Sequence, residues 1–88
     1  MAGSKQLPDH EQEGLQRAVL LACKDTALSI NEILAAPGVT AYVERYGEEP
    51  VKRFVRALAK TSLLFQSHQT SAAVYRSTKD AKRLLDED

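Results

Sequence analysis

The sequence is poor in the residues that stabilise very small secreted or metal-bound domains. It has one cysteine, Cys23, among 88 residues, which excludes a disulfide scaffold and a zinc site built from several cysteines. Tryptophan is absent, and the longest apolar run, residues 18–23, is too short to span a membrane. Residues 1–14 contain no apolar segment of the kind found in secretory signals. We therefore expect a protein of a reducing compartment, either cytoplasmic and nucleoid-associated or nuclear, that does not contact membranes.

The motifs of enzyme chemistry are also missing. The sequence has no glycine-rich phosphate loop, no histidine paired with a carboxylate at metal-ligand spacing, and no evident base near Cys23. Cys23 lies on the apolar side of the first predicted helix, so we expect it to be a small core residue. The sequence therefore predicts no enzymatic activity, no metal site, no cofactor and no small-molecule substrate.

Charge is balanced over the whole chain but not along it. Twelve basic and twelve acidic residues give a net charge of zero. Residues 1–50 hold four bases and eight acids, whereas residues 51–83 hold eight bases and a single acid, Asp80. The stretch 84–88 adds three more acids. A strongly basic segment inside a neutral chain indicates a polyanionic partner for that segment.

The first helix is predicted from apolar spacing and from its capping residues. Residues 1–8 are small and polar, and we expect them to be disordered. The helix covers 10–24, with Asp9 as its N-cap and Gln12 completing a capping box. Acidic residues in its first turn are favoured by the helix dipole.

A second, shorter helix follows over 30–36. Ser29 is suited to cap it, with Glu32 at the third helical position. A Pro-Gly pair then ends this helix sharply. Thr40 is expected to cap a short turn of helix over 41–47, which a glycine closes.

The clearest helical pattern covers 49–61, with Pro50 in its first turn. Its apolar residues recur at intervals of three and four positions and so share one face: Val51, Phe54, Val55, Leu58 and Ala59. Its basic residues lie off this stripe: Lys52, Arg53, Arg56 and Lys60. The pattern therefore predicts a helix that buries the apolar stripe and exposes a row of cations.

From Leu63 onwards the periodicity changes from that of a helix to that of strands. Two runs rich in Leu, Phe, Val and Tyr flank a polar turn, which predicts a β-hairpin over 62–77. The remaining stretch, 79–88, is predicted to be a short charged helix or a charged tail.

The order of a helix, a short helix, a longer helix and a hairpin resembles the winged helix-turn-helix superfamily of DNA-binding domains. "LSINEILAA" (28–36) is similar to the second helix of that motif, with Leu28 in the short strand before it. "EEPVKRFVRALAKTSLL" (48–64) is similar to the recognition helix, and 62–77 is similar to the wing. The resemblance implies a mostly α fold with a small β-hairpin (α+β), with a three-helix core plus a two-stranded wing over residues 9–78.

One segment departs from the superfamily pattern. Members join their second and third helices by a short turn, whereas here residues 37–47 intervene. Either the turn is expanded by an extra turn of helix, or the second helix lies elsewhere in the sequence.

The resemblance implies DNA binding, and the distribution of charge agrees with it. Helix 49–61 would dock in the major groove, which admits one helix, while the wing 62–77 contacts the backbone. Lysine and arginine release counterions at phosphates, and arginine also suits guanine edges. The candidate DNA-binding residues are Lys52, Arg53, Arg56, Lys60, His68, Gln69, Thr70 and Arg76. We expect these side chains to form one continuous positive surface.

Two functions follow from these observations. The first is a small DNA-binding protein, a transcriptional regulator or an accessory factor in replication or recombination. A lone domain of this size binds a short site weakly, so we expect a homodimer or a larger complex on double-stranded DNA. The alternative is a winged-helix protein–protein interaction module or a subunit of a larger assembly. Overall neutrality favours the alternative, because the acidic first half can pair with the basic second half of another copy or partner.

Overall fold

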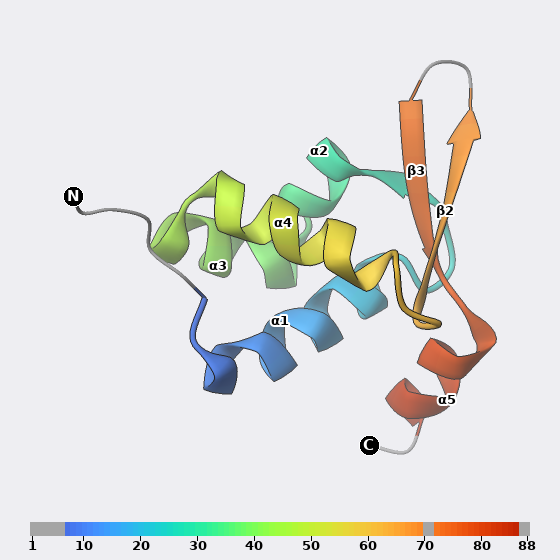
Figure 1. Ribbon diagram of the computed structural model, residues 1–88, viewed down its shortest axis with the longest axis horizontal. Helices are drawn as coiled ribbons and strands as arrows, with labels where there is room; N and C mark the ends of the chain where they lie inside the picture. The colour runs from blue at the N-terminus through green and yellow to red at the C-terminus, as the bar shows by residue number, and fades with distance from the viewer. Residues whose placement is uncertain (1–6, 70–71, 87–88) are drawn as a thin grey trace.

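Five helices and a three-stranded sheet make up the part of the chain that the computed structural model describes, residues 7–69 and 72–86 (Figure 1). The elements are α1 (Asp9–Ala22), β1 (Leu28–Ser29), α2 (Ile30–Leu34), α3 (Pro37–Tyr46), α4 (Glu48–Leu58), β2 (Leu64–Gln69), β3 (Ala72–Ser77) and α5 (Lys79–Asp86). This confirms the predicted fold class, which is mostly α with a small β-hairpin.

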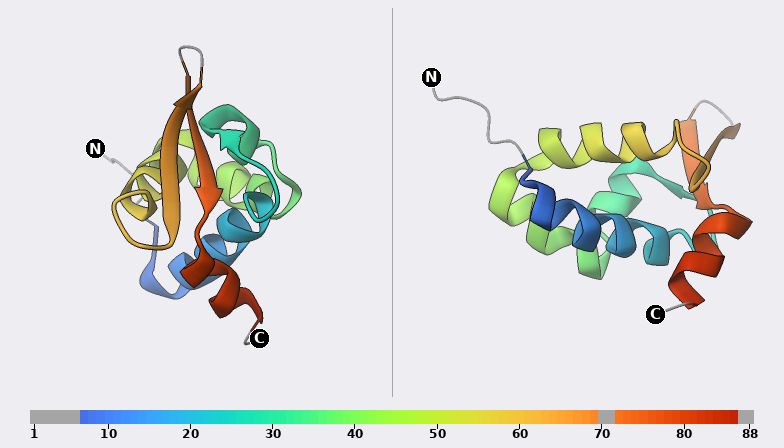
Figure 2. Two further views of the ribbon diagram at one scale, coloured as in Figure 1. Left: turned by 90° about the vertical axis from the view of Figure 1, so that its right-hand side faces the viewer. Right: turned by 60° about the horizontal axis from the view of Figure 1, so that its bottom comes forward.

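The sheet is antiparallel, with the strand order β1-β3-β2. The predicted hairpin is formed by β2 and β3, in the register that places Gln66 opposite Tyr75. On the other side of β3, Leu28 is opposite Tyr75, so the short strand expected at Leu28 is also confirmed. Figure 1 and Figure 2 show that one end of β2 and β3 extends beyond the helices, while the other end lies against them.

The start of α1 differs from the prediction. Pro8, not Asp9, is the N-cap residue, and no side chain caps the helix there. Asp9 is the first helical residue, and the side-chain amide of Gln12 donates back to the Leu7 carbonyl at 3.2 Å. Leu7 is partly buried against the core, so at least this end of the segment expected to be disordered is packed. Residues 1–6 lie outside the described part of the chain.

The predicted cap of α2 is confirmed. The Glu32 amide donates to the Ser29 hydroxyl at 3.3 Å, and the Ser29 amide donates to the Glu32 carboxylate at 2.8 Å. These two bonds form a complete capping box, which satisfies amide groups that the helix itself leaves unpaired. The helix ends at Leu34, two residues earlier than the sequence indicated.

The segment between α2 and α4 contains a helix of ten residues, α3. Pro37 begins this helix instead of ending the previous one, because proline needs no amide partner in the first turn. Thr40 is therefore inside the helix, where its hydroxyl donates to the Pro37 carbonyl at 3.1 Å, and its predicted role as a cap is wrong. Gly47 closes α3 with a positive φ of 91°, a conformation that glycine adopts without strain, and α4 begins at the next residue.

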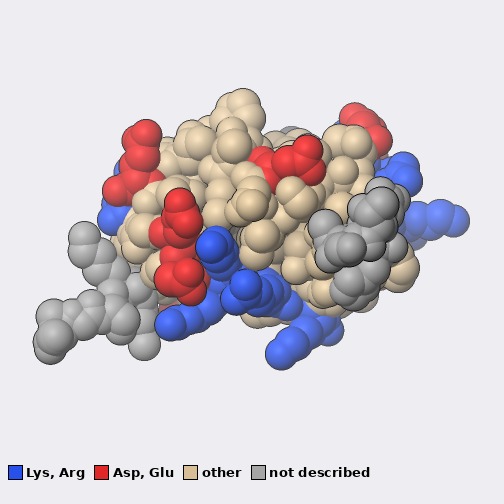
Figure 3. Space-filling view, turned by 90° about the horizontal axis from the view of Figure 1, so that it is seen from above, with Lys and Arg blue, Asp and Glu red and all other residues tan. Residues whose placement is uncertain are grey.

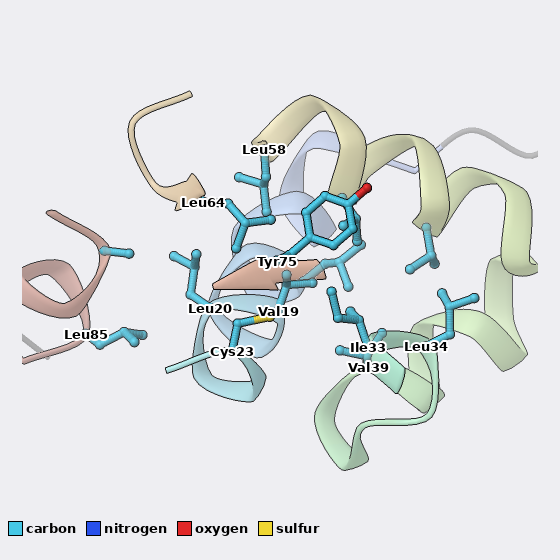
Figure 4. Close-up of a cluster of buried hydrophobic side chains, with 14 residues drawn as sticks. Val19, Leu20, Cys23, Ile33, Leu34, Val39, Leu58, Leu64, Tyr75 and Leu85 are labelled. Atoms are coloured by element: carbon cyan, nitrogen blue, oxygen red, sulfur yellow. The ribbon is translucent and has the colours of Figure 1, made fainter. Parts of the chain in front are cut away.

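The core forms where all five helices and the sheet meet, as Figure 4 shows, and it includes Val39 of α3 and Leu85 of α5. The apolar stripe of α4 faces inward as predicted, with Val51 and Val55 fully buried and Leu58 nearly so. Tyr75 of β3 lies among these side chains with 4% of its surface exposed. The hairpin is therefore fixed to the helices through one face of its strands.

The base of β3 is also joined to the end of α1 by hydrogen bonds. Ser77 is the one polar residue that is buried among the described residues. Its hydroxyl donates to the Leu20 carbonyl at 2.6 Å, and its amide donates to the Cys23 carbonyl at 3.1 Å. Cys23 is a core residue as expected, and burial raises the pKa of its thiol to about 11.

The last described segment is a helix packed against α1. In α5, Ala81 is fully buried and Leu85 nearly so. The Ala81 amide donates to the Thr78 hydroxyl at 3.3 Å, which satisfies a donor in the first turn. None of the helices in the described ranges is long and apolar enough to cross a membrane.

Candidate binding surface on helix α4 and the hairpin

Three basic residues of α4 and the turn after it point away from the core. Arg53 and Arg56 are exposed on the helix, and Lys60 is exposed in the turn that leads to β2. None of the three has a carboxylate partner among residues 7–69 and 72–86. The exposure of Arg53 and Arg56 follows from the helical period, because burying Val51, Val55 and Leu58 on one face turns these two positions to the opposite face.

Lys52 has a different environment from these three cations. Its side chain is only 22% exposed, and its ammonium lies 3.6 Å from Glu48 and 3.8 Å from Glu49. Two carboxylates therefore offset its charge. The row of cations predicted along α4 is free of acidic partners from Arg53 onwards, and Lys52 belongs to an ion-pair group at the start of the helix.

The sign of the charge consequently changes along the exposed side of α4. Glu48 and Glu49 are about two-thirds exposed at the N-terminal end, where the helix dipole favours acids. Figure 3 shows Asp and Glu side chains gathered at one end of a row of Lys and Arg side chains on this face. A second group of Lys and Arg side chains lies apart from that row in the same view. From its N-terminal to its C-terminal end, α4 therefore presents negative charge and then positive charge to a ligand.

The hairpin contributes one described candidate residue, Arg76 of β3, which is exposed. Its cross-strand partner is Phe65 of β2, and 62% of the Phe65 surface is exposed. The backbone of His68 and Gln69 lies in β2. The side chains of these two residues, and the whole of Thr70, fall outside the described part, as does the tip that was expected to contact DNA.

Sequence reasoning missed the exposed Phe65. Alternation along β2 offered a signal, because Leu64 is 1% exposed and must face the core, which turns its neighbour Phe65 to the other face. The same reasoning applied to β3 places Tyr75 inward and Arg76 outward. An aromatic ring and a guanidinium group are therefore adjacent on the outer face of the hairpin.

A polar cluster at the other end of the helices was also missed. Arg45 and Tyr46 at the end of α3 both donate to one carboxylate oxygen of Glu11 in α1, the tyrosine hydroxyl at 2.8 Å. The hydrogen bond from Tyr46, followed by that from Arg45, holds the pKa of Glu11 below its ordinary value. This cluster joins α1 to α3 and does not lie on the α4 surface.

Among the described residues, the surface of α4 and the hairpin presents charged and apolar side chains. Within the described ranges there is no cluster of three or more histidine, cysteine or acidic residues that would hold a metal ion. Cys23 is buried and protonated at neutral pH, which keeps it from acting as a nucleophile.

Comparison with known proteins gives one partial match. Residues 29–59 match the family described as selenocysteine synthase N terminal. The matched region runs from the cap of α2 through α3 to the end of α4, which is less than half of the chain. No curated protein and no solved structure matches the chain with significance. Over α2, α3 and α4 the chain is thus similar to the N-terminal part of an enzyme.

Proposed function

We propose that this chain is a non-catalytic winged-helix module that docks on a partner protein through α4, as a subunit of a larger assembly. The observation that carries the proposal is the change of charge along α4, from Glu48 and Glu49 to Arg53 and Arg56. The partner surface we expect is mainly acidic, with a basic or neutral margin opposite the start of the helix. Electrostatic complementarity of this kind gives orientation and specificity to a protein interface.

The same charge pattern is unfavourable for docking in a DNA groove. In helix-turn-helix proteins the N-terminal residues of the recognition helix contact the base edges. Here that end carries Glu48 and Glu49, and carboxylates are repelled by the phosphates on both sides of a groove. A protein partner can present both signs of charge, whereas a duplex presents only one.

The winged-helix arrangement supports a docking role for this helix. In this interpretation α4 takes the place of the third helix, and the hairpin of β2 and β3 is the wing. The region similar to selenocysteine synthase includes α4 and is described as the N-terminal part of that enzyme. This agrees with a segment that serves a larger protein without carrying chemistry of its own.

Double-stranded DNA is the second candidate partner. It is favoured by the exposure of Arg53, Arg56 and Lys60, none of which has an acidic partner in the described part of the chain. The wing residues expected to assist are His68, Gln69, Thr70 and Arg76. In that case the protein would be a regulator or an accessory factor, acting as a dimer or in a larger complex.

Titration with two probes tests both candidates. We would follow backbone amide signals by NMR while adding poly-L-glutamate, as an acidic polypeptide, or a random DNA duplex, at low and at physiological salt. Polyglutamate matches only the acidic part of the expected partner, so docking on protein predicts shifts along α4 from Arg53 onwards, which the double variant Arg53→Ala and Arg56→Ala abolishes. A matched control, Lys79→Ala with Arg83→Ala on α5, removes two exposed cations elsewhere and should leave the shifts in place.

Substitutions at the acidic end of α4 distinguish a protein partner from DNA. If this end repels DNA, the double variant Glu48→Gln and Glu49→Gln should bind the duplex at least about tenfold more tightly than the natural chain at low salt. Submicromolar duplex binding by the natural chain at physiological salt, unchanged in that variant, would overturn the proposal in favour of DNA, because non-specific binding is typically about 1–100 µM there.

A further inference from the structure

The outer edge of β2 exposes backbone groups that can form hydrogen bonds. The Thr78 amide donates to the Leu63 carbonyl, which makes this pair a hydrogen-bonded one next to the ladder of β2 and β3. Because such pairs alternate in an antiparallel sheet, Phe65 and Ser67 bond to β3 and Gln66 directs its amide and carbonyl away from β3. No other described residue bonds to those outward groups.

The strand has none of the features that usually protect an edge. Native proteins place charged residues, proline or a bulge on an exposed edge strand, or keep it very short. β2 is six residues long, "LFQSHQ", with no Lys, Arg, Asp, Glu or Pro, and its pairing with β3 is continuous over residues 64–69. In Figure 1 no helix lies beside the upper part of β2 on its free side. The edge is therefore open to a further strand.

We propose that the occupant of this edge is β2 of a second copy, paired antiparallel about a two-fold axis at Gln66. The outward groups of Gln66 then bond to those of Gln66 in the other copy. The two ladders join into one six-stranded sheet through about six backbone hydrogen bonds. The inference concerns the backbone edge of β2, and it does not depend on the proposed function.

The side chains of β2 suit a second copy better than a partner of one charge. In this register Phe65 is opposite Ser67 of the other copy, so the two Phe65 rings are diagonal neighbours on one face, within reach of each other. Each ring is 62% exposed in the single chain and gains cover by pairing. Because the strand carries no charge, like charges do not face each other across the two-fold axis. A net charge of zero also removes long-range repulsion between copies.

Sedimentation of the full chain over about 10 µM to 1 mM tests the inference. We expect a reversible monomer–dimer equilibrium. Gln66→Pro removes the outward amide without removing a donor from the β2–β3 ladder, and proline is tolerated on edge strands at such positions. This variant and Phe65→Lys should each raise the dissociation constant at least about tenfold. The control Leu84→Lys charges another exposed apolar residue, on α5, and should leave the equilibrium unchanged.

Hydrogen exchange on the natural chain gives a test that does not depend on whether the variants fold. The amide of Gln66 should be protected at high protein concentration and exposed on dilution, whereas the amides of Phe65 and Ser67 stay protected throughout. Three results would each overturn the inference. The chain could remain monomeric up to 1 mM, the protection of the Gln66 amide could be independent of protein concentration, or Leu84→Lys could weaken the dimer as much as the β2 variants do.

Discussion

The two edge strands of the sheet, β1 and β2, differ in how well they are protected against pairing with a further strand. β1 is two residues long and continues directly into α2, and both the amide and the hydroxyl of Ser29 are engaged in the capping box. β2 is three times as long, is uncharged and exposes Phe65. A very short strand is a usual protection of an edge, and polar groups that are already hydrogen-bonded are not available to a further strand. The β1 edge has both of them and the β2 edge has neither.

If β2 pairs with a second copy as proposed, stability and association depend on different atoms of one strand. Leu64 turns its side chain into the core, while the neighbouring Phe65 and the outward amide of Gln66 face away from it. The core therefore constrains the inner face of β2, whereas its outer edge is free to bind another molecule. Substitutions that separate these two roles test the comparison directly.

The largest effect is expected at the inner face of β2. Leu64→Ala should lower the free energy of unfolding by about 2–5 kcal/mol, because it removes a fully buried side chain and leaves a cavity. Phe65→Ala, one residue away, should change it by less than about 0.5 kcal/mol under conditions where the chain is monomeric. Urea denaturation of the two variants measures both values. If both variants lost the same free energy of unfolding, the ring of Phe65 would be part of the core, and the inner and outer faces of β2 would not differ in their contribution to stability.

A smaller effect is expected where β3 meets α1. Ser77→Ala should cost about 1–3 kcal/mol, since it leaves the buried Leu20 carbonyl without the hydroxyl that bonds to it. Ser67→Ala, in the same hairpin, serves as the matched control and should stay within about 0.5 kcal/mol. Thermal unfolding of dilute protein measures the stability of both variants. If Ser77→Ala were as stable as the natural chain, the hydrogen bond between β3 and α1 would not contribute to stability.

The cap at the β1 edge should contribute about 1 kcal/mol. Ser29→Ala removes the hydroxyl that accepts from the Glu32 amide, and the loss of such a cap typically costs about 0.5–2 kcal/mol. The same variant should leave the association of copies through β2 unchanged. Chemical denaturation and sedimentation of one preparation check both statements, and a weakened dimer would show that the two edges are coupled.

The smallest effect concerns Glu11, at the end of the helices away from both edges. Its pKa is lower in the folded chain than its ordinary value of 4.5, so the folded state binds fewer protons than the unfolded one. The stability that it provides is present above about pH 4.5 and is lost as the pH falls through the folded pKa. Glu11→Gln should therefore be less stable than the natural chain at pH 7, with a difference that narrows under acid conditions. Melting curves at several pH values test this, and Glu13→Gln is the neighbouring control.

Local signals in the sequence predicted much of the fold. The stripe of α4, the Ser29 cap and the change of period before the hairpin each depend on residues a few positions apart, so propensity and spacing are sufficient to find them. Pro37 was assigned to the end of a helix because proline suits both a break and a first turn, and only packing decides between them. The link from Glu11 to Tyr46 joins residues 35 positions apart, and no local pattern specifies it.

The candidate site was predicted in composition more than in arrangement. Exposure of Arg53 and Arg56 follows from the helical period, and the structure agrees. The neutralisation of Lys52 was missed because Glu48 and Glu49 were assigned only to the helix dipole, although they also lie four and three positions before Lys52. The open edge of β2 could not be predicted from composition. Its outward hydrogen-bonding groups belong to the backbone, and which residues carry them depends on the register of the sheet.

The buried Cys23 has a practical consequence. Alkylating reagents and mild oxidants react with the thiolate form of cysteine. A buried thiol with a pKa of about 11 is almost entirely protonated at neutral pH, so very little thiolate is present. The native chain should therefore remain unlabelled by maleimide until it unfolds. A single cysteine introduced on the surface of the hairpin would then accept a fluorophore or a spin label selectively, with the natural thiol left in place.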